Sequence, residues 1–340
     1  MTSKNRFNHV STKHIPAQKQ DQSPIFCYNI TMIKKKIVFK IVAGIIAFLA
    51  IVSIGASFYF FHVAQVRGDK SFISHAATPK SSPLYQDEKD FLKLDKENLS
   101  LKNDGLNLKA WYVPAENKTD KTVIVVHGFN GSKEQMAAYG MLFHKLGYNV
   151  LMPDNRAHGA SDGTLIGYGV TDKRDLIKWT NQLIKTNPQS EITYFGLSMG
   201  AATVMMASGQ NLPKNVVNII EDCGYSSVWD ELTFQAKDMY NLPAFPLLYE
   251  VSALSKVRAG FAYGEAGASS VKALSHNKLP VLFIHGDADD FVPTAMVDQN
   301  YAATKGPREK FIVKGAKHAK SLEIDKAGYY AKVAAFLAKY

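Results

Sequence analysis

The chain has 340 residues, of which 46% are hydrophobic and 21% charged, a length and composition sufficient for one large α/β domain. Seven of its ten net positive charges lie in residues 1–40, which hold eight basic residues and one acidic residue. A nucleic-acid-binding domain would carry its basic excess on the folded surface, so this distribution predicts no nucleic-acid partner. The two cysteines, Cys27 and Cys223, fall on either side of an apolar segment, which excludes a disulfide framework.

The amino-terminal residues 1–31 are polar and lack helical or strand periodicity, a pattern that predicts disorder. Met32 opens the stretch MIKKKIVFK, which is typical of a translation start. Residues 1–31 are therefore either part of a cytoplasmic tail over residues 1–36 or the product of a start codon assigned too early.

The apolar segment Ile41–Phe61 contains no charged residue and is long enough for a bilayer span of about 20 residues. Four lysines at positions 34–40 precede it, and only Arg67 and Lys70 follow closely. The positive-inside rule then predicts a cytoplasmic amino terminus and an extracellular remainder. We expect a signal anchor over residues 37–66 in a single-pass membrane protein at the cell surface. Cleavage near Ala64 and a buried core helix are the alternatives.

A linker over residues 67–83 is indicated by a composition rich in Ser, Ala, Thr and Pro, and residues 84–340 are expected to form the folded domain. Asn103-Asp104-Gly105 between two apolar runs, Leu99–Leu101 and Leu108–Val113, predicts a hairpin.

Beyond the hairpin, short apolar runs alternate with helical patterns, which predicts a mostly parallel sheet covered by helices on both faces. Residues 226–279 break the alternation with many aromatic residues and no convincing strand, so we expect a small helical cap there. The expected strands are Thr122–Val126, Tyr148–Met152, Ile192–Phe195, Val216–Ile220, Val281–Ile284 and Lys310–Val313, and the expected helices are Ser132–Leu146, Thr171–Lys185, Met199–Ser208, one from about Thr294, and Ile324–Ala338.

The pentapeptide Gly196-Leu197-Ser198-Met199-Gly200 follows an expected strand and opens an expected helix. A nucleophilic serine needs such a tight turn to project its hydroxyl from the edge of the sheet, and small flanking residues let strand and helix approach. The alternative is a glycine-rich turn with Ser198 as a helix cap.

Two further loops supply the groups that a nucleophilic serine requires. An oxyanion needs backbone N–H donors, and the backbone amides of Met199 and Phe129, the latter in the stretch His127–Gly131, are placed to provide them. His318 follows the last expected strand and is the candidate base.

Candidate acids follow the strand Val281–Ile284 at Asp287, Asp289 and Asp290, with Asp222 at another strand end. An acid near residue 289 gives the chain order serine, acid, histidine, which is the order in α/β hydrolases.

Residues 84–340 resemble the α/β-hydrolase superfamily, and are most similar to its prolyl-oligopeptidase-like or serine-aminopeptidase-like branch of membrane-anchored bacterial hydrolases. The matching stretches are VVHGFNGSK, PDNRAHGASDG, FGLSMGA, PVLFIHGDADDFVP and GAKHAKS. The resemblance implies that the acid of the pattern H-G-x-x-D-x-x-V-P is Asp289. For the stretch from Asp154 to Ser161 the resemblance implies a mainly structural role, in which Asp154 and Arg156 hold the loop together. The alternative is that His158 contacts the substrate.

These residues together predict a serine hydrolase that cleaves small carboxylic esters with short to medium acyl groups through an acyl-enzyme. No cofactor and no metal are expected. The alternatives are a peptidase or acyltransferase that uses the same residues, and a non-catalytic surface-binding module. A peptidase acting at free amino termini needs an acidic anchor, for which Glu231, Asp238 and Glu250 are candidates.

Overall fold

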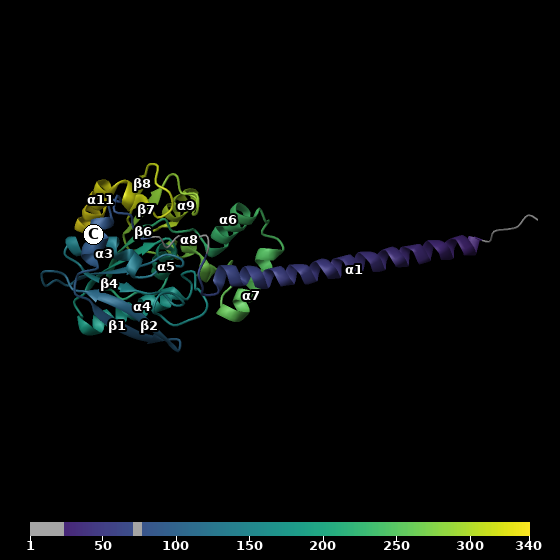
Figure 1. Cartoon of the computed structure of the whole chain (residues 1–340), viewed down its shortest axis with the longest axis horizontal. Helices are drawn as coiled ribbons and strands as arrows, with labels where there is room; N and C mark the ends of the chain where they lie inside the picture. The colour runs from purple at the N-terminus through teal and green to yellow at the C-terminus, as the bar shows by residue number, and fades with distance from the viewer. Residues whose placement is uncertain (1–23, 71–76) are drawn as a thin grey trace, which may run out of the picture. The chain divides into compact units, whose positions relative to one another are not determined.

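The structure is a computed structural model that describes residues 24–70 and 77–340 (Figure 1). The prediction of disorder for residues 1–23 therefore lies outside the described residues, as do residues 71–76 of the expected linker. For residues 24–31 the prediction of disorder is wrong, because they are helical and lead into the apolar helix. The chain divides into two compact units, Met1–Val52 and Ser53–Tyr340.

The first unit contains most of one long helix, α1 (Pro24–Gln65), which continues into the second unit. Within it, Met32–Gln65 is long and apolar enough to cross a membrane, with a mean hydropathy of 2.7 in its most apolar window. This helix is longer than the expected segment 37–66 at its amino end.

The second unit is built on an eight-stranded sheet in the order β1-β2-β4-β3-β5-β6-β7-β8. Strand β2 is antiparallel to both of its neighbours, and all other neighbouring strands are parallel. The predicted mostly parallel sheet is thus confirmed. Its strands are β1 (Glu97–Asn103), β2 (Leu106–Val113), β3 (Lys121–Val126), β4 (Asn149–Pro153), β5 (Glu191–Leu197), β6 (Val216–Asp222), β7 (Val281–Gly286) and β8 (Arg308–Val313).

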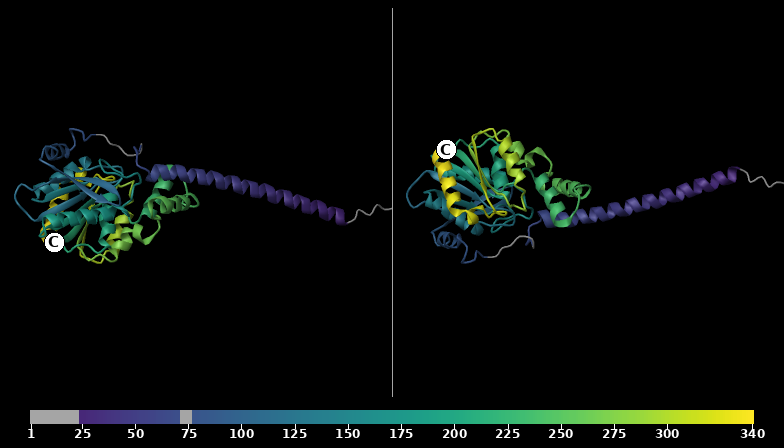
Figure 2. Two further views of the ribbon diagram at one scale, coloured as in Figure 1. Left: turned by 90° about the horizontal axis from the view of Figure 1, so that it is seen from below. Right: turned by 90° about the horizontal axis from the view of Figure 1, so that it is seen from above.

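Helices cover both faces of this sheet (Figure 2). The side chains of β3 show why, because Val123 and Val125 belong to the core under one layer while Ile124 and Val126 belong to the core under the other. One layer consists of α2 (Tyr85–Phe91), α3 (Ala137–Lys145) and α11 (Lys326–Lys339), and the other of α4 (Asp172–Thr186), α5 (Met199–Ser208), α8 (Ser270–Leu274) and α9 (Ala295–Ala303).

The predicted hairpin forms between β1 and β2. Asp104 and Gly105 both have positive φ, at 50° and 77°. This is the turn that an Asp-Gly pair favours, because its twist matches that of the strands it joins.

One predicted helix is broken in the structure. The expected helix Ser132–Leu146 begins as a 3₁₀ turn, η1 (Glu134–Met136), before α3. The expected last helix, Ile324–Ala338, corresponds to α11, which begins two residues later because Asp325 is not helical and its side chain caps α11 by accepting from the Gly328 amide. A short helix, α10 (Ser321–Ile324), precedes this cap.

The segment expected to form a cap, residues 226–279, holds two helices of 13 residues each, α6 (Val228–Tyr240) and α7 (Leu247–Ala259), then a 3₁₀ turn η2 (Ala266–Ala268) and α8. Helix α8 packs on the sheet side through Leu274, whereas α6 and α7 contribute Val228, Leu248 and Val251 to a separate apolar cluster.

Candidate active site

Ser198 lies on the turn between β5 and α5 in a strained backbone conformation, with φ 55° and ψ −114°. The two flanking glycines permit this turn, since a Cβ on Gly196 would overlap the backbone of Gly200 and a Cβ on Gly200 would overlap the carbonyl of Val126. The Ser198 amide donates to the Asp222 carbonyl at 2.8 Å, which ties the turn to β6. The serine hydroxyl is thereby held at the carboxyl end of the central strands.

The structure brings together three of the residues that the sequence indicated, from loops far apart in the chain. His318 Nε2 lies 2.9 Å from Ser198 Oγ, and His318 Nδ1 lies 2.8 Å from Asp289 Oδ2. Both distances are those of ordinary hydrogen bonds, so a continuous chain of three groups joins the serine hydroxyl to a carboxylate.

Asp289 is fixed by more than His318. Its Oδ1 accepts from the amides of Phe291 and Val292, each at 2.9 Å, and His285 Nε2 lies 3.2 Å from its Oδ2. Although burial alone would raise the pKa of Asp289, its hydrogen bonds with His285 and His318 outweigh burial and hold the pKa well below its ordinary range. The carboxylate is therefore charged at neutral pH.

The other candidate acids have different partners. Asp287 accepts from the Gly315 amide at 2.6 Å, Asp290 pairs with Lys317 at 2.8 Å on the surface, and Asp222 accepts from the Tyr329 hydroxyl at 2.9 Å. Among the described residues, none of these three acids forms a hydrogen bond or ion pair with His318.

The loop of the expected oxyanion donor Phe129 runs close to the serine. A Cβ on Gly128 would lie 3.3 Å from both the Leu197 carbonyl oxygen and Ser198 Cβ. Met199 is the first residue of α5, and Phe129 and Met199 both line the pocket that contains Ser198. The two expected amides thus lie on the two segments that border the serine.

The histidines of the neighbouring loops are held in neutral forms. His127 Nε2 accepts from the Asn155 amide at 2.9 Å, and burial lowers the pKa of His127 to about 4. His158 Nε2 accepts from the Asn130 amide at 3.0 Å, and burial, with a smaller contribution from His127, lowers the pKa of His158 to about 3. Both histidines therefore connect neighbouring loops.

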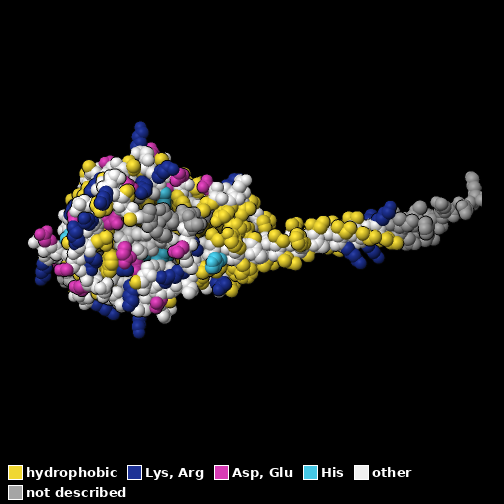
Figure 3. All heavy atoms as spheres, viewed as in Figure 1, with side chains coloured by type: hydrophobic (Ala, Val, Ile, Leu, Met, Phe, Trp, Pro, Cys, Tyr) yellow, Lys and Arg dark blue, Asp and Glu magenta, His cyan; other side chains and the backbone are white. Residues whose placement is uncertain are grey.

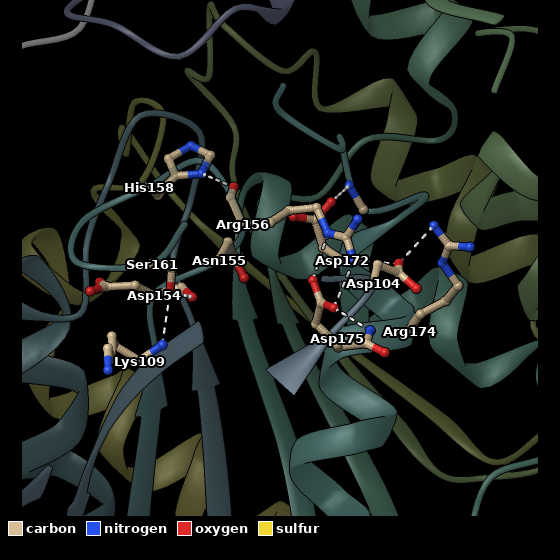
Figure 4. Close-up of polar contacts among 12 residues, drawn as sticks. Asp104, Lys109, Asp154, Asn155, Arg156, His158, Ser161, Asp172, Arg174 and Asp175 are labelled. Atoms are coloured by element: carbon tan, nitrogen blue, oxygen red, sulfur yellow. Dashed lines mark hydrogen bonds and ion pairs between the residues drawn. The ribbon is translucent and has the colours of Figure 1, made fainter. Parts of the chain in front are cut away.

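The stretch from Asp154 to Ser161 is tied to its surroundings by buried charges (Figure 4). Asp154 pairs with Lys133 at 2.6 Å, and Arg156 makes two hydrogen bonds of 2.7 Å with Asp175. Ser161 Oγ donates to the Asp154 carbonyl at 2.8 Å and accepts from the Lys109 amide. These contacts hold the loop that carries His158.

An apolar pocket of about 110 Å³ opens at Ser198. Its walls include the cap helices α6 and α7, the loops that carry Phe129 and Phe291, and the end of α1 with Phe60, Val63 and Ala64. Three tyrosines from other segments also line it, Tyr168, Tyr225 and Tyr263. Glu231 is the single acidic side chain among the lining residues that the structure describes. Such a pocket suits an apolar group attached to the reacting carbonyl.

For three features of the site, the sequence prediction did not give the role that the structure shows. His285 was noted only as the start of a motif, although the pattern H-G-x-x-D at a strand end could have indicated its contact with Asp289. Glu231 was one of three equivalent acids. The α1 residues of the pocket were assigned wholly to a membrane span, and no signal in the apolar run distinguishes them.

Cys223 is buried directly after β6. Its thiol, Asp289 and His318 have their ligand atoms within 4.8 Å of one another. Burial, followed by the charges of Asp222 and Asp289, raises the pKa of the thiol well above its ordinary value. The thiol therefore stays protonated at neutral pH.

Comparison with known proteins agrees with this architecture. Residues 121–241 match the family described as alpha/beta hydrolase fold. The uncharacterized protein YqkD of Bacillus subtilis is 32% identical over 234 residues, which cover 68% of this chain and 76% of the relative. The chain belongs to the α/β-hydrolase superfamily, and its relatives include proteins of the YqkD and YfhR type.

Among solved structures, the Pyrococcus furiosus esterase Pf2001 is similar with a TM-score of 0.61 and 22% identity, covering 81% of this chain and 98% of the esterase. An acylaminoacyl peptidase of Pyrococcus horikoshii is similar with a TM-score of 0.53 and 17% identity, covering 72% of this chain and 42% of the peptidase. At these identities the likeness concerns the fold.

Proposed function

We propose that the protein is a serine hydrolase that cleaves small carboxylic esters through an acyl-enzyme, with Ser198 as nucleophile, His318 as base and Asp289 as the acid that orients the histidine. The observation that carries this proposal is the hydrogen-bonded chain Ser198–His318–Asp289, with distances of 2.9 and 2.8 Å. The likeness of fold to an esterase adds support.

In the first half of the reaction, the Ser198 hydroxyl proton passes to His318 Nε2 while Oγ attacks the ester carbonyl carbon. The amides of Phe129 and Met199 donate to the oxyanion, and the charged Asp289 steadies the imidazolium. His318 then gives its proton to the leaving alcohol, and the acyl group remains on Ser198.

In the second half, His318 takes a proton from water, the resulting hydroxide attacks the acyl carbon, and the carboxylic acid leaves as Ser198 regains its proton. An acyltransferase would differ only in the acceptor, since another alcohol would replace water.

A fluorophosphonate probe tests the assignment. We expect the probe mass on the peptide that contains Ser198, together with turnover of a p-nitrophenyl ester. Ser198→Ala should remove both while thermal unfolding stays within a few degrees of the wild type, because one hydroxyl is lost. Ester turnover by Ser198→Ala at the wild-type rate would contradict the proposal.

A second candidate, cleavage of amides in peptides with a free amino terminus, is favoured by Glu231. This side chain lines the pocket of Ser198, its Oε1 accepts from Gln235 at 3.0 Å, and its Oε2 has no hydrogen-bond partner among the described residues. Burial raises the pKa of Glu231 to about 8. A substrate ammonium group would satisfy Oε2 and favour its charged form.

The two other acids considered for this role are placed differently. Asp238 is exposed, and Glu250 accepts from the Ser53 hydroxyl at 2.9 Å. Parallel assays with acyl esters and aminoacyl p-nitroanilides distinguish the candidates. Preference for the anilides, lost in Glu231→Gln, would assign the protein to the peptidases.

For the location, we propose a single-pass cell-membrane protein whose α1 is an uncleaved anchor, with residues 1–36 in the cytoplasm and the catalytic unit outside. The apolar run Met32–Gln65 supports a span, and the lysines before it support the orientation. Within the expected cap segment 226–279, α6 and α7 are the proposed cap over the site.

A further inference from the structure

The end of α1 is part of the catalytic unit, which begins at Ser53. Its attachment is built from specific contacts. Phe61 is 1% exposed, the Tyr168 hydroxyl donates to the Ala64 carbonyl at 2.7 Å, and the Tyr263 hydroxyl donates to Gln65 Oε1 at 2.8 Å. This stretch of α1 is therefore a fixed element of the folded unit.

One side of this stretch faces the pocket of Ser198. Phe60, Val63 and Ala64 lie three and four positions apart, so they share a face of the helix, and all three line the pocket. Apolar side chains of α6 and α7 line the same pocket, among them Met239, Leu248 and Val251. We call the space between these six residues the acyl groove.

The outer part of the acyl groove borders an exposed apolar surface. Phe60 and Tyr240 meet edge to face with ring centroids 5.0 Å apart, and Met239 and Tyr240, which both line the pocket, are 37% and 39% exposed.

Of the large apolar side chains that are exposed in the described part of this unit, most lie on this region (Figure 3). They are Ile54, Phe58, Tyr59, Met239, Tyr240, Phe245, Tyr249 and Val257, against Leu92, Ile312 and Ile324 elsewhere. Exposed apolar surface of this extent marks contact with an apolar partner or phase.

We propose that the end of α1 forms one wall of a binding site for the acyl chain, and that the substrate is an amphiphilic carboxylic ester whose chain lies between α1 and the cap helices. The inference rests on the proposed ester hydrolysis at Ser198. The acyl groove gives the acyl chain an apolar wall. The exposed apolar rim contacts the apolar end of an amphiphilic substrate as it enters. Val63 and Ala64 then set the length of chain that the groove accepts.

The test compares hydrolysis of p-nitrophenyl octanoate and p-nitrophenyl acetate by the full chain in phosphatidylcholine nanodiscs. In Val63→Trp the indole fills the groove, so the ratio of kcat/KM for octanoate to that for acetate should fall at least about tenfold. The matched control is His62→Trp, because His62 neighbours Val63, is exposed and is not among the lining residues. It should keep the wild-type ratio.

Val63→Ala makes the opposite change, and it tests the inference even if Val63→Trp does not fold. It widens the groove, so the ratio should rise in favour of octanoate. The inference is overturned if Val63→Trp keeps the wild-type ratio while acetate is still cleaved, or if Val63→Ala leaves the ratio unchanged. If the wild type cleaves neither ester, whether or not Ser198 is labelled, this result would instead overturn the proposed ester hydrolysis on which the inference rests.

Discussion

Replacement of Asp289 by asparagine is the most direct test of the proposed acid, because it changes charge with almost no change of shape. The Asp289 side chain is fully buried, and its Oδ2 contacts both His318 and His285. In Asp289→Asn the amide oxygen still accepts from the Phe291 and Val292 amides. The amide nitrogen then faces His318 Nδ1. A hydrogen-bond donor therefore stands where the carboxylate oxygen accepted a hydrogen bond from Nδ1.

This reversal should turn His318 into the tautomer that carries its proton on Nε2, and that form does not accept the Ser198 proton. In serine proteases the equivalent change lowers kcat about 10⁴-fold, and four factors of ten correspond to about 5 kcal/mol of activation free energy. We expect a loss of the same order here, since the carboxylate is buried and bonded to the base at 2.8 Å.

The assay measures kcat for a p-nitrophenyl ester beside thermal unfolding, so that a loss of activity is separated from a loss of fold. Asp287→Asn and Asp290→Asn are matched controls, as their partners are the Gly315 amide and Lys317. Each should lower kcat by less than about tenfold. A larger loss in Asp287→Asn than in Asp289→Asn would refute the assignment.

Four further outcomes are expected. His285→Gln removes one of the two imidazoles that contact Asp289 Oδ2, so the carboxylate is held less firmly and kcat for a p-nitrophenyl ester should fall, by less than in Asp289→Asn. Gly200→Ala should prevent folding, seen as loss of soluble protein, because the added Cβ overlaps the Val126 carbonyl. The pKa of Glu231 is raised to about 8 in the folded state, so its contribution to stability is lost as pH rises from about 4.5 to 8. The Tm should therefore fall over this pH range, and Glu231→Gln should make the fall smaller. Protease added to intact cells should digest the catalytic unit and leave an anchored amino-terminal stub, whereas protection until lysis would refute the orientation.

The sequence was most informative where one residue type is required by geometry. The glycines beside Ser198 and the Asp-Gly turn after β1 are such positions, since other residues would overlap neighbouring backbone or adopt strained φ angles. The alternation of strand and helix patterns likewise predicted the layered sheet, because the central strands bury both of their faces.

Prediction was poorest where one pattern serves two purposes. The run up to Gln65 is apolar throughout, so hydropathy assigned all of it to a membrane span, although Phe61 and Gln65 are buried in the catalytic unit. Glu231 could not be separated from Asp238 and Glu250, because burial in a pocket depends on contacts between distant segments. The choice among four acids needed the distances to His318 for the same reason.

The attachment of Gln65 bears on whether the enzyme is ever shed from the cell. The bond between Ala64 and Gln65 is the site at which a signal peptidase would cut, and proteases bind their substrates as extended strands. In the folded unit, however, this bond lies at the end of a helix, the Gln65 side chain is fully buried, and the Ala64 carbonyl is held by Tyr168. Cutting there would require the segment to unwind and leave the fold. Cleavage at this bond is therefore expected only on the nascent chain, before the segment folds.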